Sequence, residues 1–195
     1  MNRKSIAALL ATVTLLTGCL VPEKFVAKAD IHPDGSYSFS YNGTVVHGMA
    51  AMQIAKTGKL TAKDETGLDS EAEKMKRNPD VKSVSYKGNG RYELALDATR
   101  KKGQPLNMLN IASVRTDKDG IITISSAEIK EKDKKELSQL GIKVDGTLEI
   151  SVPKNAEIIS HNATSTPKFF GLVGTYSWKI GSVDQRPLMK IRLKG

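Results

Sequence analysis

The sequence predicts an α+β fold, with a mostly antiparallel sheet of several hairpins and about three short helices packed on one face of the sheet. Most of the chain alternates between apolar and polar residues with a period of two, which is typical of strands that bury one face. The connections between these alternating segments are short, so neighbouring strands are expected to pair antiparallel. Three other segments carry helix start or stop signals, and each is too short to be stable alone, so we expect them to pack on the sheet.

The first expected hairpin joins residues 25–31 to residues 37–41 through the Pro-Asp-Gly turn at residues 33–35. Two later hairpins turn at Gly-containing loops, and their strands cover residues 82–86 with 91–97 and residues 109–116 with 121–127. A further strand, 148–152, ends at Pro153, and the C-terminal strands cover residues 176–180 and 189–193. In the segment 176–180, Trp178 shares a face with Tyr176 and Ile180, so we expect Trp178 to lie in the core.

The three expected helices cover residues 48–56, 70–77 and 132–140. Ser70, with Glu73 three residues later, has the spacing of a capping box and predicts the start of the second helix. Gly141 predicts the end of the third helix, because Leu137 and Ile142 are spaced for the apolar contact of a Schellman cap.

Size and composition indicate one domain with its own core. The chain has 195 residues, 39% of them hydrophobic and 26% charged, which excludes a disordered polymer, a disulfide scaffold and a protein with many membrane spans. With 30 Lys and Arg against 21 Asp and Glu, the chain is basic. The lysines are spread through mixed-charge runs such as residues 130–136, which favours a solvated face over a specific anion site.

The N-terminus has the layout of a secretory signal peptide. Arg3 and Lys4 precede an uncharged, mostly apolar run over residues 6–16, which is too short for a membrane-spanning helix. The run leads into Leu16-Thr17-Gly18-Cys19, which resembles a bacterial lipobox. That resemblance implies cleavage before Cys19 and attachment of a diacylglyceryl group to its thiol.

We therefore expect residues 1–18 to be a lipoprotein signal peptide, residues 19–24 a lipidated tether, and residues 25–195 a single periplasmic domain. Two or three acyl chains hold a protein stably on a bilayer, so Cys19 is the expected membrane anchor. Many Gram-negative lipoproteins that stay at the inner membrane have Asp after the lipidated Cys. Leu20 stands there in this chain, which favours the outer membrane, facing the periplasm, and nucleic acid is not an expected partner in that compartment.

No motif for catalysis stands out in the sequence. His32, His47 and His161 lack metal-ligand spacing, and no Gly-x-Ser-x-Gly turn is present, so we expect no metal, no cofactor and no catalytic residue. The most apolar segment after the leader contains Phe169, Phe170 and Leu172. It is either a loop that contacts a ligand or a membrane, or the start of a core strand, and the core interpretation is favoured.

The second half of the chain resembles the LppM-like bacterial lipoproteins. The resemblance rests on Ile150-Ser151-Val152-Pro153, on Asn162, and on the strand centred on Trp178. It implies an α+β domain tethered to the cell envelope, without catalytic residues, that binds a lipid or glycolipid.

Three functions are compatible with these features. The leading one is a lipid-anchored binding or interaction module whose ligand is an amphiphile or another envelope protein. The second is a structural or assembly factor of the outer membrane that acts through protein contacts, and the third is a hydrolase of envelope polymers. A cavity between the helices and the sheet would favour the first, an exposed apolar patch the second, and His and carboxylate side chains in a cleft the third.

Overall fold

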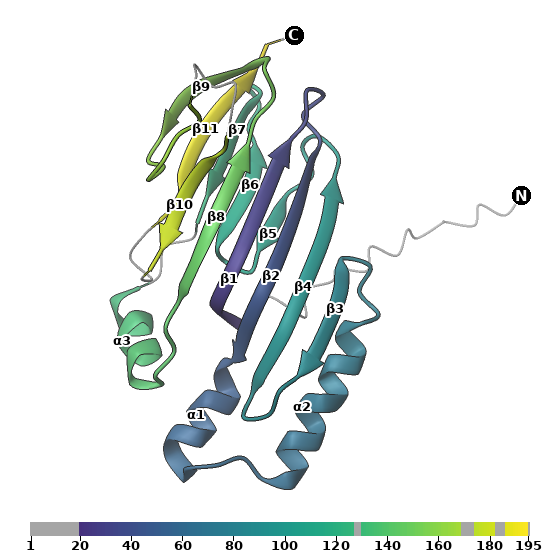
Figure 1. Cartoon of the computed structure of the whole chain (residues 1–195), viewed down its shortest axis with the longest axis vertical. Coiled ribbons are helices and arrows are strands. Elements are labelled where there is room, and N and C mark those ends of the chain that lie inside the picture. The colour runs from purple at the N-terminus through teal and green to yellow at the C-terminus, as the bar shows by residue number, and fades with distance from the viewer. Residues whose placement is uncertain (1–19, 127–129, 169–173, 182–185, 195) are drawn as a thin grey trace, which may run out of the picture.

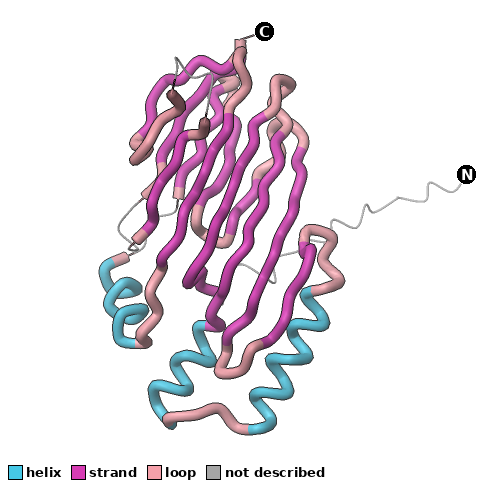
Figure 2. Tube along the Cα trace, viewed as in Figure 1, coloured by secondary structure: helices cyan, strands magenta, loops and turns pink. Residues whose placement is uncertain are grey.

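The computed structural model describes residues 20–126, 130–168, 174–181 and 186–194. These residues form two sheets that face each other, together with three helices at one end of the molecule (Figures 1 and 2). The α+β fold class is confirmed. The structure differs from the expectation of one sheet, because the strands divide between a six-stranded sheet in the order β10-β8-β1-β2-β4-β3 and a five-stranded sheet in the order β5-β6-β7-β11-β9.

The six-stranded sheet contains the longest strands of the described chain. Its members are β1 (Leu20–Ile31), β2 (Tyr37–His47), β3 (Val81–Tyr86), β4 (Arg91–Arg100), β8 (Asp145–Ser151) and β10 (Tyr176–Ile180). Every neighbouring pair in it is antiparallel except β1 and β8, which run parallel, with Ala27 opposite Leu148. The short connections predicted antiparallel pairing between neighbouring strands. The parallel pair differs from this prediction because more than a hundred residues of the chain separate β1 from β8.

The five-stranded sheet is antiparallel throughout. Its members are β5 (Leu106–Met108), β6 (Ala112–Thr116), β7 (Ile121–Ser125), β9 (Ala156–His161) and β11 (Leu188–Leu193). The strands β5 and β9 were not expected from the sequence. The last two strands of the chain do not pair with each other, because β10 joins β8 in the first sheet and β11 lies between β7 and β9 in the second.

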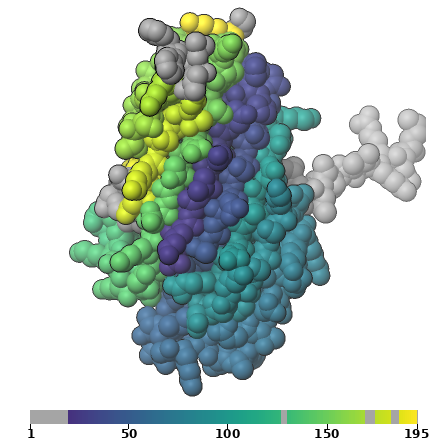
Figure 3. Space-filling view, viewed as in Figure 1, coloured from purple at the N-terminus to yellow at the C-terminus, as the bar shows by residue number. Residues whose placement is uncertain are grey.

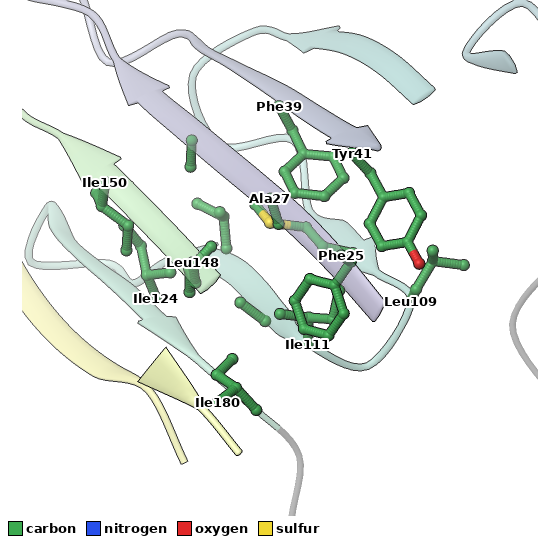
Figure 4. Close-up of a cluster of buried hydrophobic side chains, with 14 of the residues drawn as sticks. Phe25, Ala27, Phe39, Tyr41, Leu109, Ile111, Ile124, Leu148, Ile150 and Ile180 are labelled. Atoms are coloured by element: carbon green, nitrogen blue, oxygen red, sulfur yellow. The ribbon is translucent and has the colours of Figure 1, made fainter. Parts of the chain in front are cut away.

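The main core lies between the two sheets. Inward side chains of β1 and β2 meet apolar side chains of the second sheet and of β8, as Figure 4 shows for Phe25, Ala27, Phe39, Tyr41, Ile111, Ile124, Leu148 and Ile150. Trp178 is 5% exposed, as its alternation with Tyr176 and Ile180 predicted. Its indole Nε1 donates a hydrogen bond to Asn162 Oδ1 over 2.8 Å, which satisfies its polar atom.

The three helices are α1 (Gly48–Thr57), α2 (Ala62–Met75) and α3 (Glu131–Gln139). The helix α2 begins eight residues before the expected start, because the capping box is made by Thr61 and Asp64 and not by Ser70 and Glu73. The hydroxyl of Ser70 instead donates to the carbonyl of Thr66 inside the helix. The end of α3 is as expected, since Ile142 N donates to Leu137 O and Gly141 N to Ser138 O.

The sequence predicted helices packed over one face of a single sheet, and the position of the helices in the structure differs from this prediction. The helix α2 packs on the inner face of the six-stranded sheet beside β3 and β4, where Ala72 and Met75 are buried. The second sheet covers the rest of that inner face (Figure 1). No helix of the described residues is both long and apolar enough to span a bilayer.

Within the segment 19–24, which was expected to be a tether, the structure describes residues 20–24 as part of β1. Leu20 already belongs to β1 and pairs with His47, and Leu20 is only 6% exposed. The apolar residues Leu20, Val21 and Pro22 are better placed against β2 than in solvent, which explains why they form part of β1.

Candidate functional site

The strongest candidate site is a pocket where the second sheet and α2 leave part of the six-stranded sheet uncovered. Its volume is about 260 Å³. Its floor is the inner face of β2 and β4, and its walls come from the turn after α2 and from the β5 hairpin. The apolar lining residues are Phe39, Leu94, Leu96, Ala98, Pro105, Leu106 and Leu109, and the polar ones are Asn78, Asp80, Arg100 and Asn107.

Strand alternation explains the apolar floor. Leu94, Leu96 and Ala98 occupy every second position of β4, so all three point to the inner face. Leu94 and Ala98 are almost fully buried, whereas Leu96 is half-buried and faces the open part of the pocket. The floor therefore presents hydrocarbon, with no charged side chain until Arg100 at the end of the strand.

The rim carries an ion pair between Arg100 and Asp80. The Arg100 guanidinium donates two hydrogen bonds to the Asp80 carboxylate, one of them from Nη1 to Oδ1 over 3.1 Å. These bonds raise the pKa of Arg100 above its ordinary value. Because each charge is paired with the other, the rim is polar but carries no net charge from this pair.

The backbone around Asp80 is held from both sides. The Asn78 side chain accepts a hydrogen bond from Asp80 N over 3.0 Å, which forms a local turn after α2. The carbonyl of Asp80 accepts from Asp97 N of β4 over 2.8 Å. The carboxylate is thus placed by the chain and does not depend on Arg100 alone for its position.

The opposite wall contains a residue in an unusual conformation. Leu109 and Asn110 have φ values of 51° and 60°, and Ile111 N donates to Met108 O over 2.9 Å. Two central residues with positive φ are the pattern of a type I′ turn, which normally prefers Asn or Gly. A leucine in this conformation costs about 1–2 kcal/mol, and here its side chain is buried against the pocket.

A second depression, of about 320 Å³, lies on the outer face of the six-stranded sheet. Its carboxylates belong to Asp30, Asp97 and Glu149. Glu149 pairs with Lys28 over 3.1 Å, and Asp30 accepts a hydrogen bond from Ser151 Oγ. These are ordinary surface contacts of a polar sheet face, and no histidine lines this depression.

The three histidines lie in different places. His32 Nδ1 is 2.9 Å from Ser36 Oγ in the first hairpin turn, and His47 Nδ1 accepts from Ala50 N at the start of α1. The His161 ring packs edge-on against Tyr176, with 4.9 Å between the ring centroids. No group of three or more potential metal-ligating side chains occurs in the part of the chain that the structure describes.

The residues singled out from the sequence lie outside the described part of the chain. These are Cys19, Phe169, Phe170 and Leu172. The pocket was missed at the sequence level, although one signal was available. Asp80 precedes one strand of a predicted hairpin and Arg100 follows the other, so two opposite charges fall at the same end of that hairpin.

Comparison with known proteins gives matches among solved structures only. No family model matches the chain, and no curated protein matches it. Among solved structures, the folded domain of Mycobacterium tuberculosis LppM, determined by NMR, matches with 14% sequence identity and a TM-score of 0.40. The match covers 89% of this chain and 91% of that domain.

Proposed function

We propose that this chain is a non-catalytic, lipid-anchored protein of the cell envelope that binds an amphiphile in the pocket between β4, the β5 hairpin and the end of α2. The observation that carries the proposal is the pocket itself, which combines an apolar floor with a polar rim. An amphiphile has the same division, with hydrocarbon for the floor and a polar head for Arg100, Asp80, Asn78 and Asn107.

The size of the pocket limits what enters it. Pockets that enclose a drug-sized ligand measure about 300–1,000 Å³, so a volume of about 260 Å³ suits one part of a ligand, such as the end of one acyl chain. The polar head would stay at the rim, where the balanced ion pair offers both a donor and an acceptor. This arrangement favours a hydroxylated or zwitterionic head over one with a large net charge.

The anchor is the second part of the proposal, and it rests on the sequence. The lipobox places the only thiol of the chain directly after an apolar leader. Acylated Cys19 would hold the protein at a membrane, where amphiphiles are abundant. Labelling with a radioactive fatty acid should mark the wild-type protein and not Cys19→Ser, and persistent label on the variant would exclude Cys19 as the site.

An assembly factor is less well supported. It would require a contiguous exposed apolar patch, whereas the large exposed apolar side chains of the described residues lie on four different elements. They are Val26 on β1, Met49 on α1, Ile159 on β9 and Leu188 on β11. Single exposed apolar residues of this kind are normal on a protein surface.

A fluorescent fatty-acid probe tests whether the pocket is the binding site. Ala98 is buried in the pocket floor, so Ala98→Leu should fill the pocket and weaken probe binding at least about tenfold. Ala95 lies on the same strand but points to the outer face, so Ala95→Leu adds the same volume elsewhere. Equal probe binding by both variants, with both folded, would place the ligand outside this pocket.

A further inference from the structure

The described chain starts without a flexible spacer. Leu20 is paired with His47, and the side chain of His47 accepts a hydrogen bond from Ala50 N at the first turn of α1. Consecutive Cα atoms lie about 3.8 Å apart. A lipid attached to Cys19 would therefore leave the protein within one residue of the start of β1, beside α1.

A small apolar cluster joins α1 and α3 at this place. Its buried members are Val46, Ala51 and Ile142, and Val21 of β1 packs against them together with Leu137 and Leu140 of the α3 end. The two helices are thus fixed to the strand that follows Cys19. Figure 3 shows the purple start of the described chain near the blue and green atoms of the helical end. We call the exposed side of α1 and α3, with residues 48–61 and 130–143, the α1–α3 surface.

The α1–α3 surface is basic, whereas the neighbouring helix is acidic. Residues 48–61 contain Lys56 and Lys59 and no acidic residue, and residues 130–143 contain five lysines against three acidic residues. Over Ala62–Met75 of α2 the balance is reversed, with five acidic residues against two lysines. Both Lys56 and Lys59 are exposed, and neither forms an ion pair with another described residue.

An apolar side chain lies in the same region. Met49, in the first turn of α1, is 63% exposed, and it is the most exposed large apolar residue of the described chain. Met49 follows His47 by two residues, so it lies next to the point where the lipid would leave the protein. Lysines around an exposed apolar residue are typical of a surface that lies on anionic headgroups.

We infer that the α1–α3 surface docks onto an anionic phospholipid bilayer, with Lys56 and Lys59 among the headgroup phosphates and Met49 at the boundary of the acyl region. The inference rests on the proposed lipidation of Cys19, which brings this surface to the membrane. Each lysine near an anionic surface raises the docked fraction relative to the undocked one about fivefold.

The test uses the full-length acylated protein with the substitution Met49→Cys. Because Cys19 carries the lipid, the new cysteine supplies the free thiol to which a fluorophore is attached. In vesicles that contain phosphatidylglycerol, the emission should shift to the blue and become protected from iodide. In vesicles of phosphatidylcholine alone, the shift should be much smaller. A matched probe on Lys118→Cys, in the exposed turn between β6 and β7 at the opposite end of the molecule, should stay open to iodide in both.

Charge variants distinguish an effect of lysines on the α1–α3 surface from an effect of the net charge of the protein. Lys56→Gln with Lys59→Gln should lower the ratio of docked to undocked protein about 25-fold. Lys101→Gln with Lys118→Gln changes the net charge equally, away from the α1–α3 surface, and should leave the ratio unchanged. An equal effect of both pairs would refute the assignment of the docking surface.

Mass spectrometry of the same sample distinguishes the two proposals. An acylated protein whose Met49→Cys probe stays exposed on phosphatidylglycerol vesicles would overturn the docking inference and leave the anchor in place. A protein without acyl mass would overturn the anchor, and the docking inference with it.

Discussion

Gly146 on β8 offers a direct test of the packing around Phe25. A Cβ atom at Gly146 would lie 2.6 Å from two ring carbons of Phe25, whereas carbon atoms in contact are about 3.5–4.0 Å apart. Overpacking of this kind costs about 1–3 kcal/mol, and alanine returns about 0.4–1 kcal/mol by restricting the unfolded chain. Gly146→Ala should therefore lower the free energy of unfolding by about 0.5–2 kcal/mol.

Alanine substitutions at two other glycines give effects with which Gly146→Ala can be compared. At Gly43, on the other side of Phe25, the added Cβ would meet backbone atoms, among them the carbonyl oxygen of Lys24, so Gly43→Ala should cost more than Gly146→Ala. At Gly67, in the middle of α2, the added Cβ meets nothing within 4 Å, so Gly67→Ala should stabilise the protein by about 0.5–1 kcal/mol.

Thermal unfolding followed by circular dichroism measures this order, since 1 kcal/mol shifts the midpoint of a protein of this size by about 2–4 °C. Phe25→Leu should partly rescue Gly146→Ala, because a smaller side chain removes the clash. If Gly146→Ala raised the midpoint as Gly67→Ala does, the Phe25 ring would not lie over Gly146.

Three further variants test the turn, the sheet junction and the helix cap. Because Leu109 has a positive φ, Leu109→Gly should be more stable than Leu109→Ala by up to about 1 kcal/mol in denaturant titrations. At Leu106, in β5, the same titrations should show the alanine variant to be more stable than the glycine variant. Asn162 Oδ1 accepts from Trp178 Nε1 and from Leu188 N, and Asn162 Nδ2 donates to Arg186 O, so Asn162→Ala should lower the free energy of unfolding by about 1–3 kcal/mol in denaturant titrations. The Thr61 hydroxyl lowers the pKa of Asp64 below its ordinary 3.8, so this carboxylate stabilises the fold fully above about pH 4 and progressively less as the pH falls through the lowered pKa. Midpoints measured from about pH 5 to about pH 2 should accordingly fall less in Asp64→Asn than in the wild type, and an equal fall would exclude this role.

Local patterns predicted most of the strands and one helix end. Alternation placed Trp178 inward, and the spacing of Leu137, Gly141 and Ile142 predicted the end of α3, because these features depend on residues close together in the chain. The start of α2 was mispredicted because Ser70 and Glu73 have capping-box spacing by coincidence, while Thr61 and Asp64 precede a segment with little apolar periodicity.

Long-range pairing could not be derived from one sequence. The parallel contact of β1 with β8, and the separation of β10 and β11 into different sheets, depend on how apolar faces pack in three dimensions. The pocket has the same origin. Leu96 and Leu106 lie on different sheets, and Asp80 reaches Arg100 only once β3 and β4 are paired.

Native mass spectrometry of the full-length protein, released gently from a bacterial envelope, tests the proposed function most directly. We expect a bound species with the mass of one amphiphile on the wild type and on Ala95→Leu, and its loss on Ala98→Leu, which fills the pocket floor. A folded, acylated wild-type protein that carries no such species, or an Ala98→Leu variant that retains it fully, would contradict the proposal that this pocket binds an amphiphile.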